Sequence, residues 1–328
     1  MMKTSALSGW AVASAFYLCD LFLRLSVDVV RADIQREFNM TASRVSSAFG
    51  SSFFWSYAAM QLPIGWILDV LGPSRTIASC SFLAATASIA FGFAKTVTFG
   101  VLARVLMGIA SSAGWLGALK VARNGYGSGN RKGNFVLGLT CMLGGIGGLV
   151  SQEPFRVLAN ALSWRTAFKV SAALPLAISI CSLLFISDEA SFESDDVPVE
   201  RKRDVKTRWV DVVKAPRMWL CAVFLGTTDG PFELFAGLWG ASYLKQAAHF
   251  SPSKAGTATT ILVIVATAGQ LAGGPMLSSC LISRKRQIAS LILLALAGFV
   301  AMILPAAHIG SSPVAAWTST ILLGVSVS

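Results

Sequence analysis

The sequence has little charge and almost no histidine. Charged side chains make up 13% of its 328 residues, and it contains two histidines, whereas a soluble domain carries about 25% charged residues. His249 and His308 both fall in expected loops, which counts against a zinc site or a histidine-based catalytic triad. The sequence also has no phosphate-binding loop. We therefore predict no enzyme activity, no metal site and no cofactor.

Paired cysteines are also missing. Each of the six cysteines lies in a separate apolar run without a Cys-x-x-Cys pair, so we expect small buried side chains rather than disulfides or metal ligands. The formal net charge of +11 does not indicate a nucleic-acid partner, because Lys and Arg lie in short loops between the apolar runs. Such loops instead set the orientation of a membrane protein.

Long apolar runs dominate the sequence, with 54% hydrophobic residues. A helix of about 20 apolar residues crosses the roughly 30 Å hydrocarbon core of a bilayer. A tenth run, 313–328, is shorter than this, so we expect the chain to end inside helix ten. The runs predict an all-α protein in a lipid bilayer, with helices at 7–29, 44–68, 75–94, 97–121, 133–157, 164–186, 217–245, 256–282 and 287–306.

One long polar segment, 187–216, divides the apolar runs. It begins acidic, ends basic and contains two prolines, a composition typical of a linker. We predict a six-helix bundle at 1–186, a cytoplasmic linker at 187–216 and a partial second bundle at 217–328.

Lys and Arg predict the orientation. With the N-terminus in the cytoplasm, sixteen of these residues fall on the inner side and nine on the outer side, which agrees with the excess of positive charge in cytoplasmic loops. The glycosylation sequon Asn39-Met-Thr41 then lies in an outer or lumenal loop. Whether the membrane is the plasma membrane or that of a lysosome-like organelle stays open.

The stretch Pro63–Arg75 lies between the second and third expected helices. Gly65, Asp69, Gly72 and Arg75 occupy a spacing that a simple turn does not require. We expect Gly72-Pro73 to end the second helix and Asp69 to cap the third. The pattern resembles the loop between helices 2 and 3 of the major facilitator superfamily, where it forms part of the inner gate.

The resemblance covers essentially the whole chain. It continues in short matches that look like the branch containing bacterial permeases for small organic solutes and the lysosomal dipeptide transporters: Phe22–Ser26, Met60–Pro63, Gly117–Lys120, Gln152-x-Pro154 and Trp164-Arg165. It implies two pseudo-symmetric six-helix bundles that rock about a midplane site.

The chain departs from the family pattern at three places. Val70 stands where a basic residue usually follows Asp69, and Ser74 replaces the first of two arginines. The corresponding loop of the second half, 274–286, keeps its basic end but has no Asp. These departures put the strength of the inner gate in doubt, not the fold.

Ionisable residues at membrane depth are functional candidates. Arg24 lies on one face of the first helix with Asp20 and Asp28; it either meets a substrate carboxylate or belongs to an ion-paired stripe that fixes helix packing. Arg104, near the outer end of the fourth helix, resembles a family motif linked to proton coupling. It either joins the substrate site or bonds backbone carbonyls.

Two further patterns concern helices five and seven. Gly144 and Gly148, followed by Pro154, allow close helix packing. Asp229 and Glu233 flank a Gly-Pro break and predict a proton-coupling site or an amine-binding site, unless one of them pairs with a cation. Trp239 belongs either to the substrate site or to an interfacial aromatic belt.

The sequence therefore predicts a secondary transporter, monomeric and coupled to protons, for a small zwitterion or anion such as an amino acid, dipeptide or carboxylate. A uniporter and a non-transporting sensor on the same fold are the alternatives. The substrate site would bring together residues of both halves: Arg24, Tyr57, Gln61, Arg104, Asp229, Glu233 and Trp239.

Overall fold

The computed structural model describes residues 6–127, 130–188, 214–228, 230, 235, 240–247, 250–279 and 293. This part of the chain contains helices and no strand, so the prediction of an all-α fold is confirmed. The first half of the chain contains α1 (Ala6–Val29), α2 (Arg31–Phe38), α3 (Ala42–Val45), the π-helical turn η1 (Ser46–Gly50), α4 (Ser51–Leu71), α5 (Pro73–Gly92), α6 (Val97–Ser111), α7 (Ala113–Tyr126), α8 (Arg131–Val150), α9 (Glu153–Leu162), α10 (Trp164–Ser171) and α11 (Ala173–Phe185).

The described part of the second half contains α13 (Pro216–Thr228), α15 (Gly240–Ala247) and α16 (Pro252–Ser279). Most of the expected linker and the expected helices at 287–306 and 313–328 lie outside the described residues. The predicted division into two bundles joined by a linker thus stays a prediction.

Four helical stretches among the described residues are long and apolar enough to cross a membrane. They are Ala6–Val29, Val97–Tyr126, Arg131–Leu162 and Trp164–Phe185. Each agrees with a helix that the apolar runs predict, although the second and third extend about five residues further than expected. Hydropathy therefore predicts where these helices lie in the sequence, while the residues at which they begin and end depend on local contacts.

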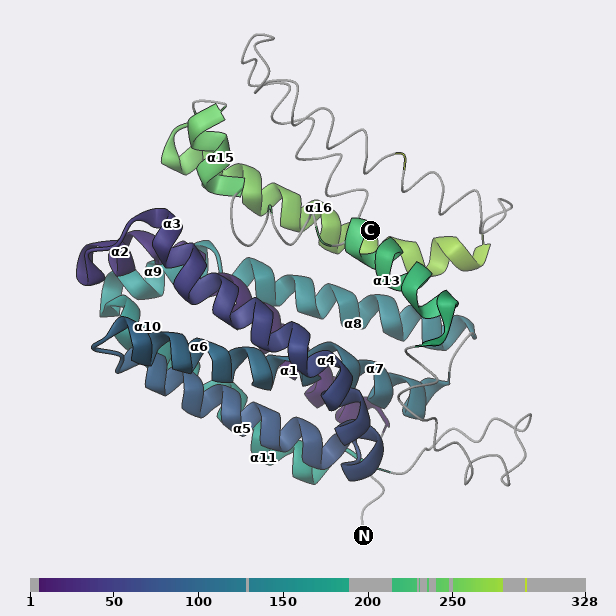
Figure 1. Ribbon diagram of the computed structural model, residues 1–328. Helices are drawn as coiled ribbons and strands as arrows, with labels where there is room; N and C mark the ends of the chain where they lie inside the picture. The colour runs from purple at the N-terminus through teal and green to yellow at the C-terminus, as the bar shows by residue number, and fades with distance from the viewer. Residues whose placement is uncertain are drawn as a thin grey trace.

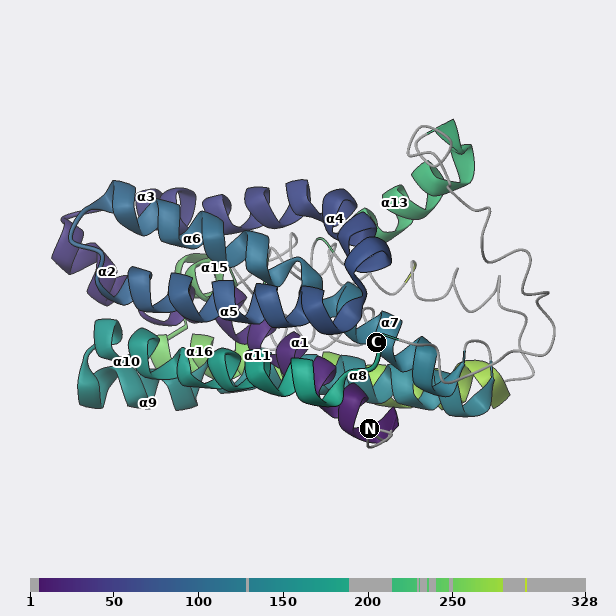
Figure 2. The ribbon, with the colours of Figure 1, turned by 90° about the horizontal axis from the view of Figure 1, so that it is seen from below.

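The helices run roughly parallel to one long axis, so the molecule has two ends (Figure 2). α2, α3 and α10 lie at one end, and the N-terminus lies at the other end with the last turn of α4 and the first turn of α8. This arrangement matches a bundle whose helices each cross the same layer.

Four of the predicted helices are divided. The fourth, 97–121, is divided into α6 and α7 at Ser112, and the sixth, 164–186, into α10 and α11 at Ala172. The expected fifth helix, 133–157, is divided into α8 and α9 at Ser151 and Gln152, because Pro154 occupies the first turn of a new helix. The expected second helix begins at Ala42 and passes through η1 before α4. Such π-helical turns often occur at functional sites.

Serine hydroxyls join α5 to α10 and α11. Ser88 donates to the carbonyl of Phe168 at 2.8 Å, and Ser74 donates to the carbonyl of Ser182 at 3.0 Å. Ser179 donates back from α11 to the carbonyl of Ala78 at 2.8 Å. Side-chain bonds of this kind replace water as partners for polar groups inside a membrane bundle.

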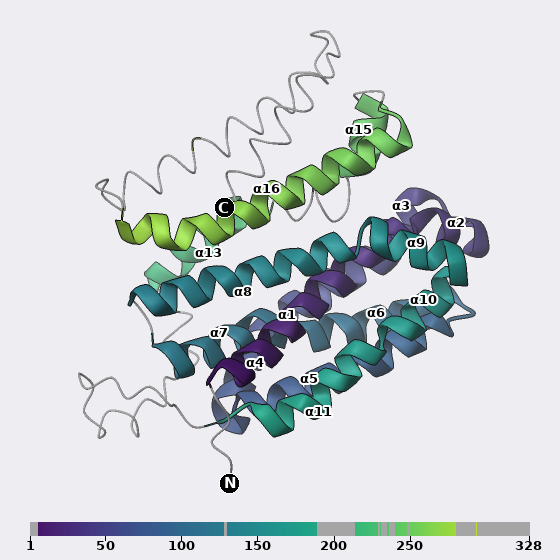
Figure 3. The same ribbon diagram turned by 180° about the vertical axis from the view of Figure 1, so that it is seen from behind.

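Small residues let α8 approach its neighbours on two sides. α8 lies between α1 and α16 in two views (Figures 1 and 3). A Cβ at Gly147 would lie 2.0 Å from the backbone oxygen of Leu18 in α1, and one at Gly145 would lie 2.2 Å from Oγ1 of Thr267 in α16. Side chains at these positions would force the helices apart.

Candidate functional site

Arg24 is held inside the bundle by a carboxylate and an aromatic ring. Its Nη2 donates to Asp20 Oδ1 at 3.3 Å and Oδ2 at 3.1 Å, one turn earlier in α1. Its guanidinium carbon lies 4.6 Å from the ring centre of Tyr57 in α4, within cation–π range. Arg24 is 9% exposed and Asp20 is 1% exposed, so removing either partner would leave a buried charge.

Gly114 in α7 makes room for this ion pair. A Cβ there would lie 2.9 Å from both Cβ and Oδ2 of Asp20. Asp20 therefore has little room to rotate away from Arg24, because the α7 backbone at Gly114 packs closely against its side chain.

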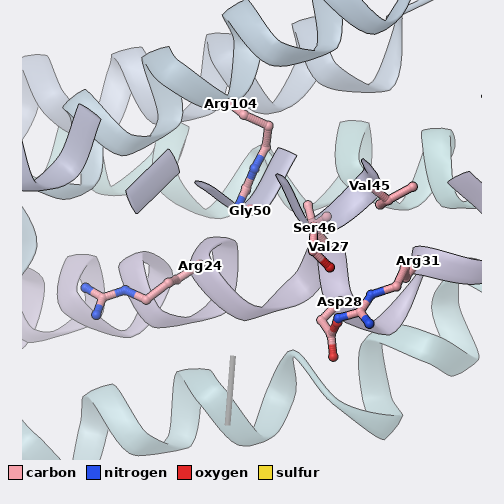
Figure 4. Close-up of a pocket in the computed structure, with 8 residues that line it drawn as sticks. All are labelled: Arg24, Val27, Asp28, Arg31, Val45, Ser46, Gly50 and Arg104. Carbon is pink, nitrogen blue, oxygen red and sulfur yellow. The ribbon is translucent and has the colours of Figure 1, made fainter. Parts of the chain in front are cut away.

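Asp28 does not continue the stripe of charge that the spacing of Asp20, Arg24 and Asp28 suggests. It forms an ion pair with Arg31 at the start of α2, and burial lowers the pKa of Arg31. Figure 4 shows the Arg24 side chain extending away from Asp28 and Arg31. α1 thus contributes to two separate ion pairs, Asp20–Arg24 within the helix and Asp28–Arg31 with α2.

Arg104 is completely buried in α6 and bonds two other helical segments. Its Nε donates to the carbonyl of Phe49 in η1 and its Nη1 to the carbonyl of Leu23 in α1, both at 2.9 Å. Its guanidinium lies 4.5 Å from the ring centre of Phe53. This geometry matches an arginine bonded to backbone carbonyls, the alternative to a substrate contact.

A small cavity lies between Arg24 and Arg104. Its volume is about 10 Å³, about the space that one water requires. Nη2 of Arg104 has no hydrogen-bond partner among the residues that the structure describes. Figure 4 shows Arg104 extending toward Gly50 in this region. The two arginines that the sequence singled out therefore line one space, together with Val27, Asp28, Arg31, Val45, Ser46 and Gly50.

Tyr57 and Gln61 lie one turn apart on α4. The Tyr57 ring stacks on Phe53 with centres 6.2 Å apart and lies beneath the Arg24 guanidinium. Nε2 of Gln61 is buried and has no hydrogen-bond partner within the described ranges. Tyr57 thus joins the Arg24 group, while Gln61 supplies a donor one turn further along.

The sequence analysis missed Tyr17 and Trp115. The Tyr17 ring lies 5.3 Å from the Trp115 ring and is within electrostatic range of Arg24 and Asp20. A Cβ at Gly144 would lie 2.2 Å from Cε1 of Tyr17. A glycine opposite a large aromatic was the only available signal, and it cannot be read without knowing which helices meet.

The other predicted packing residues follow Gly144 along the chain. A Cβ at Gly148 would lie 3.4 Å from Leu25 in α1 and 3.5 Å from Val263 in α16. Pro154 lies in the first turn of α9. Gly148 is thus at a three-helix contact and Pro154 marks a helix start.

The predicted capping of the third helix by Asp69 is wrong. Asp69 lies inside α4, which continues to Leu71, and its Oδ1 accepts from Lys120 Nζ at 2.7 Å. Lys120 also donates to the carbonyl of Leu68 at 2.7 Å. Asp69 therefore ties the end of α4 to α7 through Lys120, while Arg75 is exposed on α5.

Asp188 supplies the missing cap. Its Oδ1 accepts from the backbone N–H of Ser74 at 2.8 Å, in the first turn of α5. Gly72 has φ +80°, and a Cβ there would lie 2.5 Å from Oδ1 of Asp188. Gly72 is therefore required by its backbone and by the incoming carboxylate, whereas a Cβ at Gly65 would meet no atom within 4 Å.

The second-half candidates Asp229, Glu233 and Trp239 lie outside the described residues. Of the predicted site, the structure brings Arg24 and Tyr57 together and places Arg104 across the small cavity from Arg24. Among the residues that the structure describes, no group of three or more His, Cys, Asp and Glu side chains could hold a metal ion.

A sequence model described as Major Facilitator Superfamily matches residues 7–328. The chain belongs to this superfamily. The match confirms the predicted family, its helical fold and its place as a multi-pass protein in the membrane, and it confirms the prediction that the chain is not an enzyme.

Several superfamily proteins are similar to the chain. The probable sulfoacetate transporter SauU of Cupriavidus necator is 27% identical over 263 residues, which cover 76% of this chain and 60% of that protein. The D-galactonate transporter of Escherichia coli O6:H1 is 25% identical over 278 residues, covering 76% of this chain and 62% of that protein. The chain thus spans about three fifths of the length of these curated relatives.

A solved superfamily structure has a similar fold. It is a bacterial homologue of the human lysosomal transporter Spinster, in an inward-facing and occupied conformation. The TM-score is 0.67 at 18% identity, and the similarity covers 100% of this chain and 73% of that one.

Proposed function

We propose that this superfamily member is a secondary transporter for a small organic anion and that Arg24 binds the anionic group of the substrate. The observation that carries the proposal is a buried guanidinium, held by Asp20 and placed over the Tyr57 ring. A guanidinium presents a planar fork that matches a carboxylate or sulfonate. An arginine fixed in this way is already oriented for such a ligand.

The names of the relatives support the substrate class. Sulfoacetate and galactonate are both small organic anions. We therefore favour an organic anion over the amino acid and dipeptide that the sequence also suggested. Tyr57 and Gln61 would contact the uncharged part of the substrate, since they lie along α4 beside Arg24.

The source of energy is proposed to be a proton gradient acting through Asp229 or Glu233. Two acids at membrane depth are least costly when protonated, and the charged form needs a partner. We also propose a cytoplasmic N-terminus, from the distribution of Lys and Arg, and a monomer whose two halves alternate access to the site.

Uptake into proteoliposomes tests the role of Arg24. We expect accumulation of labelled galactonate or sulfoacetate and none of the uncharged sugar galactose. Arg24→Lys keeps the charge but loses the fork, so the substrate concentration for half-maximal uptake should rise at least about tenfold, the equivalent of one charge-assisted hydrogen bond.

Arg36→Lys is the matched control, because Arg36 forms an exposed ion pair with Asp33 in α2. It should leave uptake unchanged. If folded Arg24→Lys protein also transports normally, the proposed contact is wrong. Anion uptake that a protonophore leaves intact would instead favour a uniporter.

A further inference from the structure

An open hollow of about 550 Å³ lies where α7 ends and α8 begins, at the same end of the molecule as the N-terminus. Its volume lies within the range of about 300–1,000 Å³ typical of small-molecule pockets. It is lined by two cations, two aromatic rings and one aliphatic side chain: Arg131, Lys132, Tyr126, Phe135 and Val136. We call it the α7–α8 hollow.

On α8, the lining of the hollow consists of two pairs, each a cation and an apolar side chain one helical turn apart. Arg131 and Phe135 are four residues apart on α8, as are Lys132 and Val136, so each cation stands beside an apolar side chain one turn further into the helix. Phe135 is 50% exposed and Val136 is buried. The surface therefore changes from basic to apolar along the helix axis.

Asn130 makes two side-chain hydrogen bonds beside the hollow. Its Oδ1 accepts from the backbone N–H of Gly133 at 2.5 Å, which caps α8, and its Nδ2 donates to the carbonyl of Tyr126 at 2.9 Å. The end of α7 and the start of α8 are thus joined through one side chain. The two cations start from a fixed backbone, which lowers the entropy cost of binding a ligand.

Within the described part of the chain, neither cation of the hollow forms an ion pair with an acid. At this end of the molecule the described acids are engaged elsewhere: Asp69 pairs with Lys120, and Asp188 caps α5. Among the residues that the structure describes, no acid lines the hollow. The start of α8 adds the positive end of a helix dipole. The field in the hollow therefore attracts an anion.

The hollow also lies at the level where the bilayer changes from polar to apolar. Positions 133–152 carry no charged side chain, and a helix of about 20 residues crosses the hydrocarbon core. Arg131 and Lys132 therefore stand at the boundary and Phe135 stands just inside it. Cations one helical turn from an exposed ring at this depth match an amphiphile with an anionic head.

We propose that the α7–α8 hollow binds an anionic phospholipid of the leaflet on the N-terminal side. Arg131 and Lys132 bind the phosphate of the headgroup, Tyr126 closes the site at the boundary, and the acyl chain lies on Phe135. The choice of a lipid over a free phosphate rests on the apolar side chains of the lining, which a free phosphate would not use.

Native mass spectrometry of the chain in a neutral detergent tests this site. Phosphatidylglycerol and phosphatidylcholine are titrated separately, and the fraction of protein with retained lipid gives an apparent dissociation constant. We expect phosphatidylglycerol to bind more tightly. Arg131→Gln with Lys132→Gln should weaken its binding about 25-fold, about fivefold for each charge, and should leave phosphatidylcholine binding unchanged.

Arg44→Gln with Lys95→Gln is the matched control. Both residues are exposed and lie at the opposite end of the molecule, in α3 and in the turn between α5 and α6. This control should bind phosphatidylglycerol like the wild type. Equal loss in both double variants would mean that total charge, not the hollow, attracts the lipid, and would overturn the proposal.

Two further arms separate the lipid from other ligands. Phe135→Ala keeps both cations and should weaken binding of phosphatidylglycerol but not of glycerol phosphate. Displacement of the lipid by glycerol phosphate at equal concentration would identify a free phosphate as the ligand and overturn the proposal. Loss of thermal stability in lipid-free Arg131→Gln, Lys132→Gln protein would also overturn it, because the cations would then have a protein partner.

Discussion

Replacement of Arg104 by methionine separates the two roles open to this residue. Methionine retains an unbranched apolar side chain but donates no hydrogen bond. The carbonyls of Phe49 and Leu23 would then lose their Arg104 donors, which now lie at 2.9 Å. We therefore expect Arg104→Met to loosen the contact of α6 with α1 and η1.

The expected magnitude follows from these two bonds. A hydrogen bond to a charged group contributes about 1.5–3 kcal/mol in water, while polar contacts inside membrane proteins average nearer about 0.6 kcal/mol. Two bonds at the lower limit for charged groups give a loss of about 3 kcal/mol. At about 2 °C for each kcal/mol in a large chain, the midpoint of thermal unfolding should fall by about 6 °C.

Thermal unfolding of purified protein in detergent, without substrate, measures this change. Arg36→Met is the control, since the Arg36 side chain is 77% exposed and such pairs contribute about 0–1 kcal/mol. If Arg104→Met unfolds at the wild-type temperature but no longer binds substrate, the structural reasoning is refuted and Arg104 is a substrate contact.

Three further predictions concern the helix ends and the second half. Asp69→Asn weakens the link to Lys120 and should lower the maximal uptake rate more than the apparent substrate affinity; an unchanged rate in folded protein would contradict this. Asp188→Ala removes the cap of α5 and should cost about 1 kcal/mol of stability, whereas Asp188→Asn, which keeps an acceptor, should cost less in the same unfolding assay. Uptake should accelerate when the outer side is acidified, and Glu233→Gln should flatten this pH dependence. If Glu233→Gln and Asp229→Asn both keep the wild-type pH profile, proton coupling through either acid is excluded.

The helices of the first half could be predicted because their physical cause is local. A run of apolar residues long enough to cross a bilayer is visible in the sequence, and Ala6–Val29 and Trp164–Phe185 lie within one residue of their expected bounds. Pro154 was visible too, but not that it would begin α9 after a break at Ser151 and Gln152, because that depends on where the previous helix ends.

The site was less predictable because its partners are distant in the sequence. Asp188 caps a helix that begins 115 positions earlier, and its contact at Ser74 spans 114 positions. The nearer acid, Asp69, was the natural choice on sequence distance alone. In contrast, the Asp20–Arg24 pair could be predicted, because its spacing of four residues places both side chains on one helix face.

The two faces of α8 differ in what lies opposite their glycines. At Gly147 the opposing atom is a backbone oxygen, which moves only with the whole of α1, while at Gly145 the opposing atoms belong to the Thr267 side chain, which can change rotamer. Shear between packed helices proceeds by small side-chain adjustments at constant backbone. We therefore expect α8 to slide more easily along α16 than along α1. α8 would then move together with the first half, and the contact between α8 and α16 would be the surface along which the helices slide.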